Sequence, residues 1–219
     1  MTQSTLTKKI WMALTGLFLC FFLIIHLLGN LQLLIPGPAS QQQFNAYSQL
    51  LSGNIIIKII SYILYASIIA HVIYAIIITM QNARSRKVKY KYDKRGNLSK
   101  WYSRNMGLLG TILFIFLVIH FRDFWYVYKF GSLPLDEHGH KDLYTLVVTV
   151  YSELWYVIVY VLCMVALFYH LIHGFFSAAR TLGAYHPKYV RWIKALGWAY
   201  CIVICAGFAF IPVYVHFLK

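Results

Sequence analysis

The stretch IIIKIISYILYASIIAHVIYAIIITM, residues 55–80, decides the fold of this chain. It carries one charged residue, Lys58, and one histidine, His71. A helix of this length crosses the hydrocarbon core of a bilayer, which takes about 20 apolar residues. The stretch therefore predicts a membrane-spanning helix with a histidine inside the membrane.

The whole composition agrees with this reading. Of 219 residues, 60% are hydrophobic and only 12% are charged, and the mean hydropathy is +0.63, whereas soluble domains carry about 25% charged residues. Five stretches are long and apolar enough to span, at about 10–33, 55–80, 106–128, 149–178 and 195–217. The sequence predicts one all-α membrane domain, residues 1–219, with five transmembrane helices.

A secretory signal peptide is the competing reading of the first stretch. Lys8 and Lys9 precede an apolar run from Ile10 to Leu28, which is longer than the apolar core of about 7–15 residues in a signal peptide. We expect a retained helix.

The positive charges predict the orientation. The chain has 20 Lys and Arg against 6 Asp and Glu, a net charge of +14, which in a soluble protein indicates nucleic acid. Here 15 of the 20 cations fall on one side of the predicted spans, nine of them within residues 84–104. By the positive-inside rule the N-terminus and the basic loop 81–105 are cytoplasmic. Nucleic acid is not an expected partner. We expect anionic membrane lipid or an acidic partner subunit to contact this loop.

Four histidines occur one per span, in the first four spans: His26, His71, His120 and His170. At about 1.5 Å of rise per residue, His26 and His120 lie roughly 24 and 21 Å from the cytoplasmic ends of their helices. His71 and His170 lie roughly 15 and 14 Å from the same face. The sequence thus predicts two histidine pairs at two depths.

Two facing imidazoles without an acid or cysteine are typical of bis-histidine haem iron. Zinc requires three or four ligands, which neither level offers. A proton relay requires acids at depth, whereas the one acid we expect in a span, Glu153, lies near the outer end of the fourth. Transporters often contain repeated, broken helices, which are not evident here. The alternative for each single histidine is a hydrogen bond to a neighbouring helix. We predict a bundle enclosing two stacked b haems.

Small residues accompany the histidines. Gly16 and Gly29 flank His26, and Gly107 and Gly110 precede His120. A flat macrocycle needs helices without bulky side chains, although close helix packing uses the same glycines. Four cysteines also lie within the spans, where no disulfide framework is expected: Cys20, Cys163, Cys201 and Cys205.

Two segments resemble a known family. They are TGLFLCFFLIIHLLGN, residues 15–30, and YHLIHGFFSAARTLG, residues 169–183. With His71 and His120 late in their helices, they resemble the five-helix dihaem cytochrome b subunit that anchors succinate:quinone oxidoreductases in the membrane. The resemblance covers about residues 8–217.

The resemblance implies ligand pairs His26–His120 and His71–His170, the pairs that the depths also give. It implies two b haems as cofactors and a quinone, menaquinone in part of the family, as substrate. It further implies a flavoprotein subunit with FAD and an iron–sulfur subunit as partners, in the bacterial inner membrane. The chain would transfer electrons for a succinate dehydrogenase or fumarate reductase without itself acting on succinate.

Further cofactor contacts are predicted around these histidines. His173 and Gly174 follow His170 by one turn, and Arg84 and Arg180 end their helices on the basic side. Arg122 follows His120 by two residues and is a candidate for the outer haem. For each arginine the alternative is an interfacial anchor whose charged end reaches the membrane surface.

The connection between the first two spans is expected to hold the quinone and a short helix. The candidate quinone contacts, near the outer haem, are Gln41, Gln42, Gln43 and the neighbours of His120. Ser40 is a candidate cap for an interfacial helix with Phe44, Tyr47, Leu50 and Leu51 on one side. The sequence departs from the family here: residues 31–54 contain no acid, and no glutamate occurs at 166–169.

Two other classes of protein stay open. Anchors of nitrate reductase or hydrogenase also hold two b haems, but often with two histidines on one helix. A non-redox transporter or scaffold would use its histidine pairs for structure alone.

Overall fold

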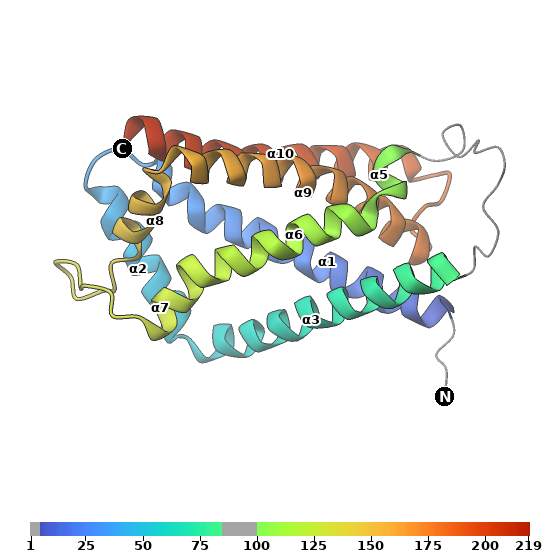
Figure 1. Cartoon of the computed structure of the whole chain (residues 1–219), viewed down its shortest axis with the longest axis horizontal. Coiled ribbons are helices and arrows are strands. Elements are labelled where there is room, and N and C mark those ends of the chain that lie inside the picture. The colour runs from blue at the N-terminus through green and yellow to red at the C-terminus, as the bar shows by residue number, and fades with distance from the viewer. Residues whose placement is uncertain (1–4, 85–99) are drawn as a thin grey trace.

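The computed structural model describes residues 5–84 and 100–219 (Figure 1). The regular structure of these residues is helical, apart from a single antiparallel bridge between Leu135 and Lys141. Five helical stretches are long and apolar enough to cross a membrane, as predicted: Leu6–Leu34, Ile55–Arg84, Met106–Phe130, Leu154–Thr181 and Val190–Leu218.

The first three spans differ in how regular they are. The first comprises α1 (Thr5–Asn30) and the 3₁₀ turn η1 (Leu31–Leu34), and the second is the single helix α3 (Ile55–Arg84). The third is composite: α6 (Met106–His120), the π-helical segment η2 (Phe121–Tyr126) and α7 (Val127–Phe130). The π-helical segment begins directly after His120, and such segments are frequent at functional sites.

The fourth span, α9 (Leu154–Thr181), forms the centre of the bundle. It packs along α10 (Val190–Leu218), α1 and α6, while α3 packs mainly along α1. Its buried side chains include Tyr156, Tyr160 and Ile172. The other long helices expose many large apolar side chains, as expected for helices that face lipid.

Two short helices cover one end of the bundle, which we call the capped end. They are α2 (Ala39–Gly53) and α8 (Leu143–Tyr151). Residues 149–151, predicted to begin the fourth span, belong to α8 instead, because the chain is extended at Glu153 before α9 starts. The prediction that Ser40 caps α2 was wrong: Pro38 is the N-cap, and the buried Ser40 hydroxyl donates to the Gln32 carbonyl at 2.9 Å.

A polar network joins the two short helices to the loop between α7 and α8. Asn45, which is fully buried, donates to Asp136 and Asp142 at 3.1 and 3.0 Å and accepts from the Tyr144 backbone at 2.9 Å. Asp142 caps α8 by accepting from the Thr145 backbone N–H. These hydrogen bonds hold α2 and α8 together across the end of the bundle.

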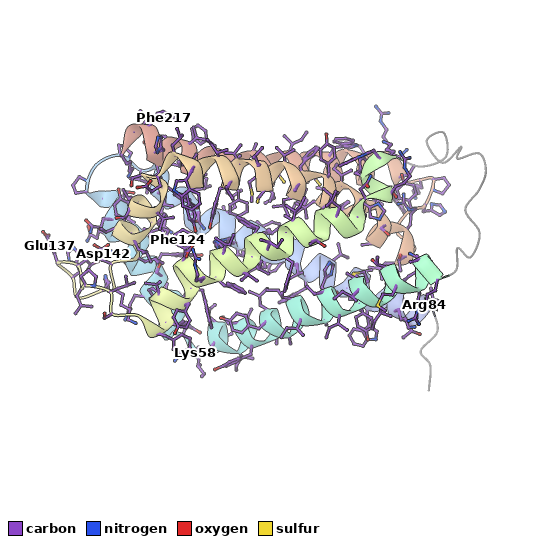
Figure 2. The ribbon with its side chains drawn as sticks, viewed as in Figure 1. Lys58, Arg84, Phe124, Glu137, Asp142 and Phe217 are labelled. Atoms are coloured by element: carbon purple, nitrogen blue, oxygen red, sulfur yellow. The ribbon has the colours of Figure 1, made fainter. Side chains whose placement is uncertain are left out.

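Basic side chains mark the other end of the bundle, which we call the basic end. Figure 2 shows Arg84 at this end and Glu137 and Asp142 at the opposite one. The short helix α5 (Trp101–Arg104) and the turn from α9 to α10 also lie here (Figure 1). Gly183 ends α9 with φ +75°, a conformation that favours glycine. Most of the predicted basic loop, residues 85–99, lies outside the described residues.

Candidate functional site

The structure brings the four histidines together as two facing pairs. His71 on α3 and His170 on α9 have ring centroids 6.2 Å apart, and we call them the basic-side pair. His26 on α1 and His120 on α6 have ring centroids 5.8 Å apart, and we call them the cap-side pair. All four side chains are half-buried. The pairing is the one that the helix depths predicted.

The spacing within each pair fits one metal ion between two imidazoles. A metal–imidazole nitrogen bond is about 2 Å long, and a ring nitrogen lies about 1.1 Å from its ring centre, so two ligands on opposite sides of one ion have ring centres about 6 Å apart. Both observed distances lie close to this value. Within the described residues no group of three or more metal-ligating side chains occurs.

Hydroxyl groups meet one histidine of each pair. Thr15 Oγ1 lies 3.3 Å from Nδ1 of His71, and the Tyr160 hydroxyl lies 3.3 Å from Nδ1 of His120. These residues escaped the sequence analysis. Thr15 directly precedes Gly16, and Tyr160 lies on α9 ten residues before His170, but only the rotation of each helix shows which histidine they meet.

Aromatic side chains surround the cap-side pair. The ring of Phe22 stacks on His26, and the ring of Phe116 stacks on His120, with centroids 5.2 and 5.8 Å apart. Phe124, labelled in Figure 2, lies 5.3 Å from His120. The cap-side imidazoles thus pack largely against aromatic rings.

Glycines face the basic-side pair from the two helices that do not supply its histidines. A Cβ on Gly16 would lie 3.4 Å from Cε1 of His71, and one on Gly110 would lie 3.9 Å from Cε1 of His170. The prediction had grouped Gly16 with His26 and Gly110 with His120. Each of these glycines lies ten residues before that histidine on its helix, at the level of the other pair.

The other residues predicted to contact a cofactor on the basic side do not gather at one place. Gly174 has no atom within 4 Å of its Cβ position, which leaves open space beside His170. His173 lies one turn further along α9, within electrostatic range of Arg180, and the Arg180 guanidinium lies over the Tyr185 ring. Arg84 is exposed at the end of α3.

Arg122 points outward rather than toward the cap-side pair. Its side chain is 68% exposed and pairs with Asp123. Asp123 in turn accepts a hydrogen bond from the buried Tyr156. Asp123 lies inside the third span, so the expectation that Glu153 is the acid within the spans overlooked it. Glu153 is exposed and precedes α9.

A cavity of about 210 Å³ lies between the cap-side pair and the capping helices. Its polar lining comes from both histidines and from Asn30, Tyr47, Ser48 and Tyr151. Of the predicted quinone contacts, Phe124 beside His120 lines the cavity. The three glutamines do not: Gln41 is held by Asp142 and Thr145, and Gln42 and Gln43 are exposed. The side chains of α2 that reach the cavity lie one and two turns later than predicted.

The four cysteines are free, as expected for thiols within spans. Comparison with known proteins adds no relative: no family model, no curated protein and no solved structure matches the chain.

Proposed function

We propose that the chain is a dihaem cytochrome b, the membrane anchor of a succinate dehydrogenase or quinol:fumarate reductase in a bacterial inner membrane. It would carry electrons between an iron–sulfur subunit and a membrane quinone. The observation that carries this proposal is the pair geometry: four helices each contribute one histidine, and these meet at two levels with centroids 5.8 and 6.2 Å apart.

The two sites fit haem better than a structural use of histidine. In the described residues no hydrogen bond joins the two rings of either pair, and Nδ1 of His170 is buried without a partner. A purely structural pair in an apolar bundle would satisfy these nitrogens, because an unpaired buried polar group is costly. A ligand bound between the two rings would account for pairs that lie this close without a hydrogen bond between them.

Each part of the chain has a role in this proposal. His71 and His170 would hold one haem and His26 and His120 the other, and each haem supplies a one-electron carrier when bound. The cavity beside the cap-side pair offers hydroxyl and amide groups to the two oxygens of a quinone headgroup. The cations of the basic end offer a surface to an acidic, electron-donating subunit.

The spectrum of the purified chain tests the proposal. We expect two low-spin b haems per chain, and each histidine variant of one pair should remove one of them. A colourless protein, or one that keeps both haems after His71→Ala and His26→Ala, contradicts it. Purification from native membranes supplies the second test, because a flavoprotein and an iron–sulfur protein should accompany the chain.

A further inference from the structure

The hydroxyl of Thr15 determines which nitrogen of His71 carries a proton. A threonine hydroxyl has one hydrogen to donate and two lone pairs that accept. Thr15 Oγ1 lies 2.8 Å from the Trp11 carbonyl oxygen, which can only accept. The hydrogen is therefore committed to Trp11, and the lone pairs face Nδ1 of His71 at 3.3 Å. Nδ1 must then be the protonated nitrogen, which leaves Nε2 with a free lone pair.

Tyr160 meets His120 at the same distance. Its side chain is 4% exposed, and the rings of Phe116 and Tyr151 hold it at centroid distances of 4.9 and 5.4 Å. Its hydroxyl lies 3.3 Å from Nδ1 of His120. A phenol can donate or accept, so its oxygen would accept from Nδ1–H of His120 once Nε2 binds the iron.

The other histidine of each pair has no such anchor. Nδ1 of His170 has no hydrogen-bond partner. Nδ1 of His26 lies 3.5 Å from the Asn30 amide nitrogen, which donates instead to the His26 carbonyl at 2.8 Å. In each pair, one imidazole contacts a hydroxyl from another helix, and the other imidazole has no such contact.

We propose that Thr15 and Tyr160 are the positioning residues of the two haem sites. Each fixes one histidine with Nδ1 protonated and Nε2 directed to the iron, and each raises the basicity of that ligand by accepting its N–H. Groups in this relation to a ligating histidine orient it and tune the metal. The inference rests on the proposed function, because it concerns ligands of the same haems.

Removal of either hydroxyl should raise the reduction potential of one haem. Thr15→Val keeps the side-chain shape but removes the acceptor, so His71 becomes a weaker donor and stabilises oxidised iron less. Loss of such a partner typically costs about tenfold or more in metal affinity; a tenfold loss confined to the ferric form would raise the potential by about 59 mV. Tyr160→Phe should shift the potential of the other haem in the same direction.

The experiment is a redox titration of the purified chain, followed by absorbance and by the electron paramagnetic resonance of each ferric haem. His170→Ala and His26→Ala identify which signal belongs to which pair. Thr15→Ser keeps the hydroxyl and should restore the wild-type potential. Thr111→Val is the matched control, because Thr111 makes the same helical bond, to the Gly107 carbonyl at 2.9 Å, on an exposed face of α6.

The crossed design separates the possible outcomes. The inference holds if Thr15→Val moves only the basic-side signal and Tyr160→Phe only the cap-side signal. It is overturned if neither signal moves, or if Thr15→Ser or Thr111→Val shifts the potential as far as Thr15→Val does. In that case two haem signals in the wild type still support the proposed function, whereas a wild type without them overturns both.

Discussion

His170 and His173 lie one turn apart on α9, but they have different surroundings. His170 faces His71, whereas His173 lies within electrostatic range of Arg180 nearer the basic end. We therefore expect His170→Ala to remove one of two haems and His173→Ala to leave both in place. Haem content per chain and the reduced spectrum measure the difference. The opposite result, with a haem lost only from His173→Ala, would move the basic-side ligand by one turn.

The histidine pairs were predictable because helical rise is nearly constant, so a count of residues gives depth within a membrane. Rotation about the helix axis is not given by such a count. Gly16 shows the consequence: it was assigned to the histidine of its own helix but faces His71 on a neighbouring one. Thr15 was missed for the same reason. Depth predicts which residues share a level, and packing decides which of them meet.

At the scale of the helices, the cap formed by α2 and α8 depends on Asn45. Its amide makes three hydrogen bonds in a fully buried position, two of them to carboxylates. Asn45→Ala leaves those groups without partners and should lower the stability by about 3 kcal/mol. Gln42→Ala on the exposed side of α2 is the control. Thermal unfolding in detergent compares the two variants, and equal midpoints would show that the network does not hold the cap.

The same network predicts a dependence on acid. Burial raises the pKa of Asp142, but hydrogen bonds from Thr145, Asn45 and Gln41 outweigh it and leave the pKa below the ordinary value of 3.8. Because the pKa of Asp142 is lower in the folded state, its carboxylate stabilises the fold above about pH 4. This stabilisation is lost as the pH falls through the folded-state pKa. The unfolding midpoint should drop steeply below pH 4, and less steeply in Asp142→Asn. Parallel curves for both proteins would contradict this.

The contact between α9 and α10 predicts an effect of one methyl group. A Cβ on Gly197 would lie 2.7 Å from the Phe175 ring and 2.9 Å from the Phe176 ring. Gly197→Ala should therefore separate the helices and destabilise the fold by about 1–3 kcal/mol, since overpacked cores cost that much. Gly53→Ala, where nothing lies within 4 Å of the Cβ position, is the control. Unfolding midpoints measure both, and equal midpoints would show that the rings simply rotate aside.

The five long helices were predictable from hydropathy, but two breaks in them were not. Residues 143–181 read as a largely apolar stretch, yet the polar Ser152 and Glu153 separate α8 from α9. The π-helical turn after His120 left no mark in the hydropathy either. Both breaks lie near the cap-side pair. There the backbone conformation depends on contacts with the loop and the capping helices rather than on the membrane.

At the scale of the whole molecule, the charges separate along the bundle axis. Among the described residues, the basic end carries Lys8, Lys9, Arg84, Lys100, Arg104, Arg180, Lys188, Arg191 and Lys194. The capped end carries the acids Asp136, Glu137 and Asp142 together with Lys129, Lys141 and Lys219, so these charges balance there. Nine cations within residues 84–104 are more than orientation requires. A variant with reversed charges in this segment should therefore bind the proposed partner subunits or anionic lipid more weakly, and increasingly so at low salt.

The orientation of the chain is the last prediction, and single cysteines test it. Positive-inside placement puts the basic end in the cytoplasm and the cap outside. Glu137→Cys lies in the exposed loop beside the cap, and Ala184→Cys lies in the exposed turn between α9 and α10. An impermeant maleimide should label Glu137→Cys in intact bacterial spheroplasts and Ala184→Cys only in inverted vesicles.

The wild type is the control for this labelling, because its four cysteines lie within the helices and three of them are buried. The reverse pattern would place the cations outside and leave the proposed subunits without a docking face. Labelling of Glu137→Cys from outside would fit the proposed electron delivery from the cytoplasm, because the basic-side pair would then lie nearer the proposed iron–sulfur partner and the cavity nearer the outer surface. Under the proposed function, the direction of the molecule in the membrane would therefore decide which pair receives electrons first.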